Sequence, residues 1–160
     1  MKQQDELQGG CLCGAIRYRL EGEPFDADHC YCSQCRKSTG AVVGSWMDFK
    51  LEQLTWQGEA VREYASSAKI RRGFCPNCGT SLSYRSLDHP EFISLSIASL
   101  DDPDRVAPRY HIYCANKPAW LEISDDCPVI PLIAVKATSR RQKRYCSIKN
   151  PPCGGFFVIH

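Results

Sequence analysis

The sequence has no long apolar run, which argues against a membrane span. Across its 160 residues no stretch reaches the roughly 18 consecutive apolar residues that a transmembrane helix needs. The first residues, MKQQDELQGG, also lack the apolar core that a secretory signal peptide carries. We therefore expect a cytoplasmic protein that makes no membrane contact.

Acidic residues are missing from the C-terminal part of the chain, where Asp126 is the last one. From residue 134 onward the chain carries six basic residues, and without them the formal net charge of +2 becomes −4. A nucleic-acid-binding domain concentrates positive charge on its folded surface, so we expect no nucleic-acid partner. We interpret 134–160 as a basic C-terminal extension of a domain that spans 8–133.

Helical periodicity is scarce, whereas short alternating segments are frequent. Apolar and polar residues alternate at 16–20 and 93–97, a pattern typical of half-buried strands. Further strands are predicted at 45–51, 61–64, 69–74, 81–84 and 109–114, and a C-terminal strand at 156–159 stays open. One short helix is predicted from Ser33, as N-cap, to Thr39, with Gly40 ending it. The sequence therefore predicts a mainly β fold with short helices.

Cysteine is abundant, with eleven residues in a chain for which we expect a reducing compartment. Disulfides are a poor explanation because cysteines two residues apart strain the dihedral angle that a bridge requires. Two thiolates at such a spacing can instead converge on one metal ion, so we predict metal binding. The alternative is a set of reduced cysteines packed as small apolar side chains.

Seven of the cysteines form two groups when they are counted against the four ligands of tetrahedral zinc. Two short turns, each followed by glycine, provide what we call the four-cysteine cluster: Cys11, Cys13, Cys75 and Cys78. The segment HCYCSQC provides the three-cysteine cluster: Cys30, Cys32 and Cys35. Four thiolates close a structural site, whereas three protein ligands leave one position open, as catalytic zinc sites do. Two zinc ions with different roles are therefore predicted.

The open position would suit a soft thiolate better than a hydrolytic water, because three thiolates already give the zinc centre a net charge of about −1. His29, Cys114 or Cys127 could instead supply a fourth ligand and close the site. Since neighbouring side chains of an extended chain point to opposite sides, His29 is the weakest of these candidates.

The order of the motifs resembles the glutathione-dependent formaldehyde-activating enzyme family and its centromere protein V-type domain. The resemblance rests on GGCLCG at 9–14, HCYCSQCR at 29–36, FCPNCG at 74–79 and KPAWL at 117–121, and it covers about residues 8–131. Departures are Cys127 before a proline and the 134–160 tail, whose Cys146 and Cys153 we interpret as free thiols.

This resemblance implies an Mss4-like fold, a structural zinc on the four-cysteine cluster and a second zinc on the three-cysteine cluster. It also implies carbon-sulfur lyase chemistry that joins formaldehyde and glutathione reversibly into S-hydroxymethylglutathione. Glutathione would then be a co-substrate, with Arg36 and Lys37 as candidate partners of its carboxylates. Ser38, Thr39 and His111 are candidate proton relays, although each is better explained as a cap or a core contact.

The alternatives to this activity are a zinc deaminase and a non-enzymatic binding module. A zinc deaminase is disfavoured because its H-x-E motif precedes P-C-x-x-C, whereas His89-Pro90-Glu91 follows the last Cys-x-x-Cys of this chain. The stronger alternative is a non-enzymatic, zinc-stapled protein-binding module that presents Trp46, Trp56 or Trp120. Equal inertness of both zinc ions would favour the module, whereas a labile second zinc that responds to glutathione would favour the enzyme.

Overall fold

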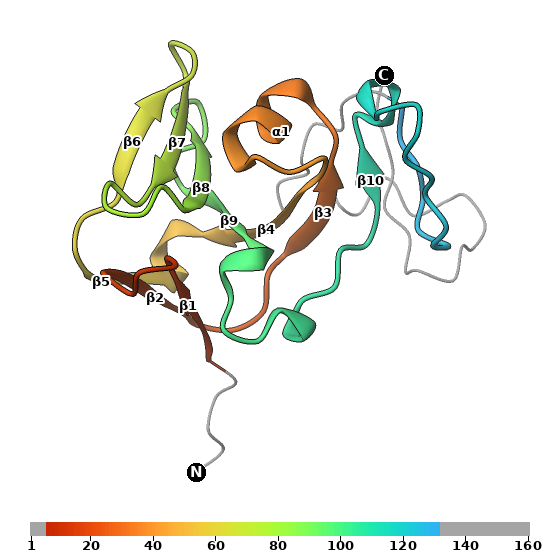
Figure 1. The fold of residues 1–160 in the computed structure, drawn as a ribbon. Helices are drawn as coiled ribbons and strands as arrows, with labels where there is room; N and C mark the ends of the chain where they lie inside the picture. The colour runs from red at the N-terminus through yellow and green to blue at the C-terminus, as the bar shows by residue number, and fades with distance from the viewer. Residues whose placement is uncertain (1–5, 132–160) are drawn as a thin grey trace. The chain divides into compact units, whose positions relative to one another are not determined.

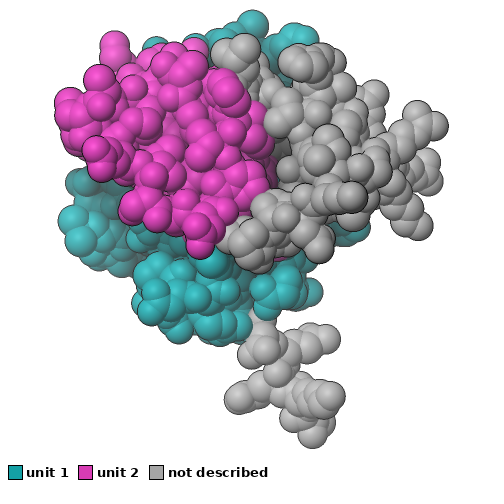
Figure 2. Space-filling model, turned by 90° about the vertical axis from the view of Figure 1, so that its right-hand side faces the viewer, with its two compact units in different colours: residues 1–26, 46–107 teal, residues 27–45, 108–160 magenta. Residues whose placement is uncertain are grey.

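The computed structural model describes residues 6–131, and the chain divides into two compact units (Figure 1, Figure 2). Unit 1 comprises residues 1–26 and 46–107, and unit 2 comprises residues 27–45 and 108–160. No helix in the described part of the chain is long and apolar enough to cross a membrane.

Unit 1 contains a small antiparallel sheet in the order β1-β2-β5. Its strands are β1 (Leu7–Gly10), β2 (Ile16–Leu20) and β5 (Leu54–Gly58). The alternation that predicted β2 is visible in its burial, because Ile16, Tyr18 and Leu20 are each at most 1% exposed. The apolar face of this sheet therefore belongs to the core.

A second set of antiparallel strands, which lies in unit 1 except for Gly44 and Ser45, is hydrogen-bonded in the order β4-β9-β8-β7-β6. They are β4 (Gly44–Lys50), β9 (Phe92–Ser96), β8 (Ser81–Ser86), β7 (Ile70–Phe74) and β6 (Arg62–Ala65). Strands β6, β7 and β8 lie side by side in Figure 1. The 3-10 turns of unit 1 are η1 (Leu51–Gln53), η2 (Ile97–Ser99) and η3 (Pro103–Arg105).

Unit 2 is built around two short parallel strands and one helix. They are β3 (Asp26–Cys30), β10 (His111–Ile112) and α1 (Ser33–Thr39), with a 3-10 turn η4 (Cys114–Asn116) after β10. In the parallel register His111 lies opposite His29, and Ile112 lies opposite Cys30. The segment after Asp126 returns to β10, since the backbone N–H of Ile130 donates to the carbonyl of His111 at 2.8 Å.

The mainly β prediction is confirmed, and the predicted helix has the observed bounds. The N-cap prediction is wrong: Cys32, and not Ser33, is the N-cap, because its sulfur accepts a hydrogen bond from the Cys35 backbone. Gly40 ends the helix in the left-handed region, as expected.

Three strands were not predicted: β1, β3 and β5. The sequence DADHC of β3 gives no apolar alternation, yet Asp26 and Asp28 are both buried. The strand predicted at 109–114 is limited to two residues, and the one predicted at 156–159 lies outside the described residues, as does the boundary at 133/134. Of the tryptophans, Trp46 is buried at 3% exposure and Trp120 is 72% exposed.

Candidate metal centres

The structure brings the cysteines of the four-cysteine cluster together in unit 1. All four sulfurs lie within 4.8 Å of one another, with Cys11 and Cys13 3.5 Å apart and Cys13 and Cys75 3.8 Å apart. Zinc-sulfur bonds of about 2.3 Å place the corners of a tetrahedron about 3.8 Å apart. The spacing of the four donors therefore suits a zinc ion, whose presence stays a prediction.

Each half of this cluster is a tight turn that ends at glycine. The N–H of Gly14 donates to the carbonyl of Cys11 at 3.1 Å, and the N–H of Gly79 donates to that of Cys75 at 2.9 Å. The φ angles of Gly14 and Gly79 are +78° and +76°, in the left-handed region that residues with a side chain rarely adopt. The turn also aims the backbone N–H of Ile16 at the sulfur of Cys11, at 3.2 Å. Hydrogen bonds of this kind stabilise a thiolate.

Thr80 connects the two halves, which are far apart in the sequence. Its hydroxyl accepts a hydrogen bond from the backbone of Leu12 at 3.0 Å and contacts the sulfur of Cys78 at 3.2 Å. The Thr80 hydroxyl, then the backbone amides of Thr80 and Cys13, lower the pKa of Cys78 to about 5. Cys78 is therefore ready to bind a metal without first losing a proton at neutral pH.

The other thiols respond to the crowding in different directions. The pKa of Cys13 is raised to about 12: a hydrogen bond from the Ala15 backbone lowers it, but the neighbouring sulfur of Cys11 and burial outweigh that effect. Burial and Cys78 would raise the pKa of Cys11, yet the Ile16 amide and the thiols of Cys13 and Cys75 bring it below its ordinary value. Cys11 and Cys75 belong to a buried apolar group with Ile16 and Leu82, whereas Cys13 is exposed.

The three-cysteine cluster forms in unit 2 at the junction of β3 and α1. Cys30 ends the strand, Cys32 caps the helix and Cys35 lies in its first turn, and their sulfurs all lie within 4.8 Å of one another. The backbone N–H of Cys35 donates to the sulfur of Cys32 at 3.1 Å. Cys30 and Cys35 are buried at 4% and 7% exposure, whereas Cys32 is half-buried. Cys32 is thus the most exposed residue of the cluster.

No fourth donor joins this cluster among the His, Cys, Asp and Glu side chains of residues 6–131. The ring of His29 is hydrogen-bonded to the hydroxyl of Ser45 at 2.8 Å, and Cys114 and Cys127 belong to neither cluster. Hydrogen bonding to Cys32 and Cys35, followed by burial, raises the pKa of Cys30. A metal ion must therefore displace the proton of Cys30 when it binds here.

Four further predicted residues lie on α1. The Nε of Arg36 donates to the carbonyl of Tyr31 at 3.2 Å, and Lys37 is exposed. The hydroxyls of Ser38 and Thr39 donate to the carbonyl of Cys35 at 3.2 Å and 2.9 Å. Both hydroxyls are thus hydrogen-bonded within the helix, and their role as a proton relay stays a prediction.

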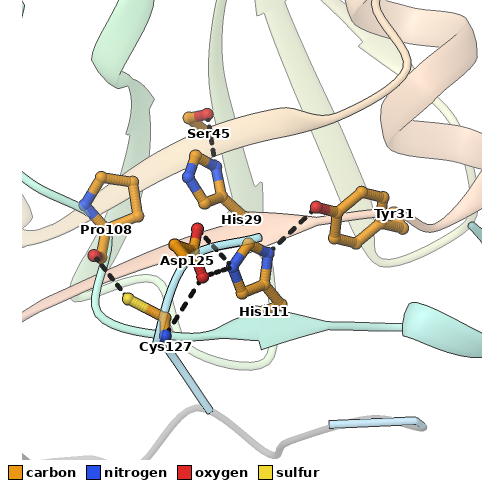
Figure 3. Close-up of polar contacts among 7 residues, drawn as sticks. All are labelled: His29, Tyr31, Ser45, Pro108, His111, Asp125 and Cys127. Carbon is orange, nitrogen blue, oxygen red and sulfur yellow. Dashed lines mark hydrogen bonds and ion pairs between the residues drawn. The ribbon is translucent and has the colours of Figure 1, made fainter. Parts of the chain in front are cut away.

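A polar group around His111, drawn in Figure 3, was only partly predicted. His111 is 2% exposed, and its two ring nitrogens contact the carboxylate of Asp125 and the hydroxyl of Tyr31. Sequence reasoning identified His111 but missed Tyr31 and Asp125. The alternation of His29 and Tyr31 with two cysteines was the available signal, because it places the polar rings on one face of the strand.

The titration of this group follows from its burial. Burial lowers the pKa of His29, the nearby ring of His111 lowers it further, and Asp125 opposes both effects. Partial burial would raise the pKa of Asp125, but hydrogen bonds from His111 and from the backbone of Cys127 hold it below its ordinary value. Burial also raises the pKa of Tyr31. At neutral pH these groups are therefore a neutral His29, a carboxylate and a phenol.

Comparison with known proteins places these clusters in a family. A family model described as glutathione-dependent formaldehyde-activating enzyme matches residues 6–116. A protein of Halomonas elongata, provisionally named as such an enzyme, is 30% identical over 73% of this chain and 80% of its own length. A Schizosaccharomyces pombe protein, named as an uncharacterized lyase, is 36% identical over 56% of this chain and 66% of its own length.

A solved structure is similar to this chain in fold. The crystal structure of a Rhodobacter sphaeroides protein has a TM-score of 0.51 and 27% identity, and the match covers 64% of this chain and 92% of that one. The mainly β fold and its cysteine clusters are consistent with the Mss4-like fold that the resemblance implies.

Proposed function

Since this chain belongs to the glutathione-dependent formaldehyde-activating enzyme family, we propose that it is a zinc-dependent carbon-sulfur lyase that joins glutathione and formaldehyde reversibly. The name of the yeast relative, a lyase, agrees with this reaction class. Family membership supports the reaction class, and the residues of this chain support the place where it occurs.

The observation that carries the proposal is the unequal number of donors in the two cysteine clusters. Four sulfurs lie close enough to surround one ion in unit 1, whereas three do so in unit 2. A zinc ion with four protein thiolates has no position for a substrate, so the first site would be structural. The three-cysteine cluster would hold the second zinc ion and leave it open to a further ligand.

Zinc held by three thiolates would supply an exchangeable position that favours the thiolate form of a bound thiol. The chain contributes the shape of the site: two buried cysteines and the more accessible Cys32, all brought together by the turn from β3 into α1. Holding a thiol and an aldehyde at this position makes their encounter effectively intramolecular, and this proximity provides most of the expected acceleration.

The reaction itself balances without an oxidant or a reductant. The sulfur of glutathione forms a bond to the carbonyl carbon of formaldehyde, while the π pair of the carbonyl moves to its oxygen. The proton lost by the thiol ends on this oxygen, which gives the hydroxymethyl group of S-hydroxymethylglutathione. The reverse reaction breaks the same carbon-sulfur bond.

Arg36 and Lys37 are proposed to bind the carboxylates of glutathione. Arg36 directly follows Cys35, the last cysteine of the cluster, and Lys37 is the next residue and is exposed. Because the Nε of Arg36 donates to the carbonyl of Tyr31, a carboxylate would contact the terminal nitrogens of its guanidinium group. Arginine suits this role since its planar group binds carboxylates in a bidentate manner.

The proposal is tested by exchange spectroscopy of glutathione and formaldehyde in the presence of the zinc-loaded protein. We expect the wild type to accelerate the exchange, Cys32→Ser to abolish the acceleration, and Cys114→Ser to retain it. Cys114 is a matched control because it lies in unit 2 but outside both clusters. Exchange at the same rate with wild type, Cys32→Ser and no protein would refute the formaldehyde assignment.

The alternative, a zinc-stapled binding module, is supported by one feature, the 72% exposure of Trp120. In that case both zinc ions would be structural, and neither would respond to glutathione. The release of zinc to a chelator separates the two functions, as described in the Discussion.

A further inference from the structure

A chain of hydrogen bonds runs through unit 2 from a half-exposed carboxylate to a buried tyrosine (Figure 3). The Asp125 oxygens lie 2.9 and 3.0 Å from Nε2 of His111, and Nδ1 of the same ring lies 3.0 Å from the hydroxyl of Tyr31. The side chain of Asp125 is 49% exposed, whereas His111 and Tyr31 are 2% and 3% exposed. The two rings are therefore held in a fixed, buried arrangement.

The direction of these hydrogen bonds follows from the chemistry of the carboxylate. A carboxylate only accepts hydrogen bonds, so Nε2 of His111 must carry a proton. In the neutral ring Nδ1 is then an acceptor, and the hydroxyl of Tyr31 is the donor. The backbone N–H of Cys127 donates to Asp125 at 3.1 Å and orients the carboxylate that selects this tautomer.

The chain of hydrogen bonds lies on the face of β3 opposite the sulfur of Cys30. Residues that lie opposite each other in a sheet share a face, and successive residues alternate. His29 and His111 are such a pair, and their rings stack with centroids 4.9 Å apart. The ring of Tyr31, two residues beyond His29, stacks on His111 at 5.7 Å. Cys30 and Cys32 alternate with these rings, so the hydrogen-bonded chain is not a direct proton path to the sulfurs.

Tyr31 is instead fixed at three points between two predicted metal ligands. Its N–H donates to the carbonyl of Ile112 at 3.0 Å, its carbonyl accepts from Arg36, and its hydroxyl is hydrogen-bonded to His111. Because Arg36 directly follows Cys35, these bonds join the parts of the chain that carry all three cysteines. Displacement of the Tyr31 ring would rotate the backbone that orients Cys30 and Cys32.

We propose that His111 and Asp125 are positioning residues that act through Tyr31 to hold the three-cysteine cluster in its metal-binding geometry. This inference rests on the proposed zinc ion at that cluster. Removal of residues that orient metal ligands without contacting the metal typically lowers metal affinity by about 10- to 100-fold. We expect the hydroxyl of Tyr31 to contribute at the lower end of that range, since the two backbone contacts of Tyr31 remain.

The test measures zinc affinity, with zinc alone as the ligand. Metal-free wild type, Tyr31→Phe, Asp125→Ala and the double variant are titrated in competition with a chromophoric chelator. We expect Tyr31→Phe and Asp125→Ala each to lower the affinity for the zinc ion of the three-cysteine cluster, the looser zinc, about tenfold. The affinity for the zinc ion of the four-cysteine cluster, the tighter zinc, should stay within twofold of the wild type. Because the two residues act in one chain of hydrogen bonds, the double variant should lose no more zinc affinity than the single variant with the larger loss.

Two matched variants control for nonspecific effects. Tyr64→Phe removes the same hydroxyl from a tyrosine that is 65% exposed in unit 1, and it should change neither zinc affinity. Ser45→Ala removes the hydrogen bond to His29 but leaves the hydrogen-bonded chain intact, and it should also have no effect. Nitrogen-15 spectra of the metal-free protein should show His111 with its proton on Nε2, and Asp125→Ala should mix the tautomers.

Unchanged affinity for the looser zinc in both Tyr31→Phe and Asp125→Ala would overturn the inference. So would equal weakening of both zinc ions, because that result means general destabilisation. A wild type that binds only the tighter zinc would overturn the proposed function and this inference together, whereas two zinc ions with unaffected variants would overturn the inference alone.

Discussion

Replacement of Thr80 by valine should weaken zinc binding at the four-cysteine cluster, and increasingly so as the pH falls. Valine keeps the shape of threonine but loses the hydroxyl. This hydroxyl contacts the sulfur of Cys78 at 3.2 Å and accepts a hydrogen bond from the N–H of Leu12 at 3.0 Å. One substitution therefore removes a contact to each half of the cluster, while the Thr80 backbone bonds remain.

The expected magnitude follows from the pKa of Cys78. This pKa is about 5, and the Thr80 hydroxyl is the largest of its causes. Without the hydroxyl the pKa moves part of the way back toward 9.0, and each unit of increase strengthens the competition of protons with zinc about tenfold below the new pKa. We expect a loss of affinity of about tenfold at pH 7 and up to about 100-fold near pH 5, within the range for groups that support metal ligands.

The sign of the pH dependence is specific. The lowered pKa keeps Cys78 ionised, so in the wild type the contribution of this thiolate to zinc affinity is lost only as the pH falls through about 5. In Thr80→Val the same loss begins at a higher pH, and the pH of half-release of the tighter zinc should therefore rise. Above pH 9 both proteins have an ionised Cys78, and only the pH-independent loss of the Leu12 hydrogen bond remains.

The measurement is a chelator competition between pH 5 and 9 on wild type, Thr80→Val and Thr80→Ser. Serine keeps the hydroxyl and should restore most of the affinity. Thr55→Val is the control, because Thr55 is an exposed residue of β5 outside the cluster. An identical pH of half-release in wild type and Thr80→Val would refute the reasoning, as would failure of serine to restore it.

Two further predictions concern metal release and an ion pair. A chelator should remove one zinc ion first with little change in far-UV circular dichroism, and glutathione should alter only that ion; simultaneous loss of two ions that ignore glutathione would favour the binding module. In unit 1 both oxygens of Glu63 accept hydrogen bonds from Arg85 at 2.6 Å, which lowers the pKa of the carboxyl. Glu63→Gln should therefore reduce the free energy of unfolding by about 0.5–1 kcal/mol at pH 7, and the difference in urea unfolding should shrink as the pH falls below 4.5 through the lowered pKa of Glu63. A difference of the same size at pH 7 and at pH 3 would contradict this origin.

The local signals in the sequence predicted the chemical groups well. Cysteines two or three residues apart and followed by glycine favour a metal-binding turn, since both the spacing and the left-handed glycine are local properties. The division into four and three cysteines, and the helix Ser33–Thr39 that ends at Gly40, follow from such signals. The mainly β class follows from the period-2 alternation of β2 and β9.

Local signals failed where neighbours in space, and not in sequence, determine the conformation. The strand β3 has aspartate at two positions that would be apolar in an ordinary buried strand, and only its pairing with β10 reveals it. The N-cap was assigned to serine because serine is a common cap, whereas the sulfur of Cys32 takes that position. The three-cysteine cluster forms by the same turn that makes Cys32 the cap.

The sequence by itself determined which residues can bind metal and how many donors each group contains, because ligand spacing is a property of a few adjacent residues. Only the tertiary structure decided that Tyr31 meets His111, 80 residues later in the chain, and that Asp125 orients this ring. Contacts of this kind depend on the parallel pairing of β3 with β10, and strand pairing between distant segments is set by the packing of the whole unit, not by any local pattern.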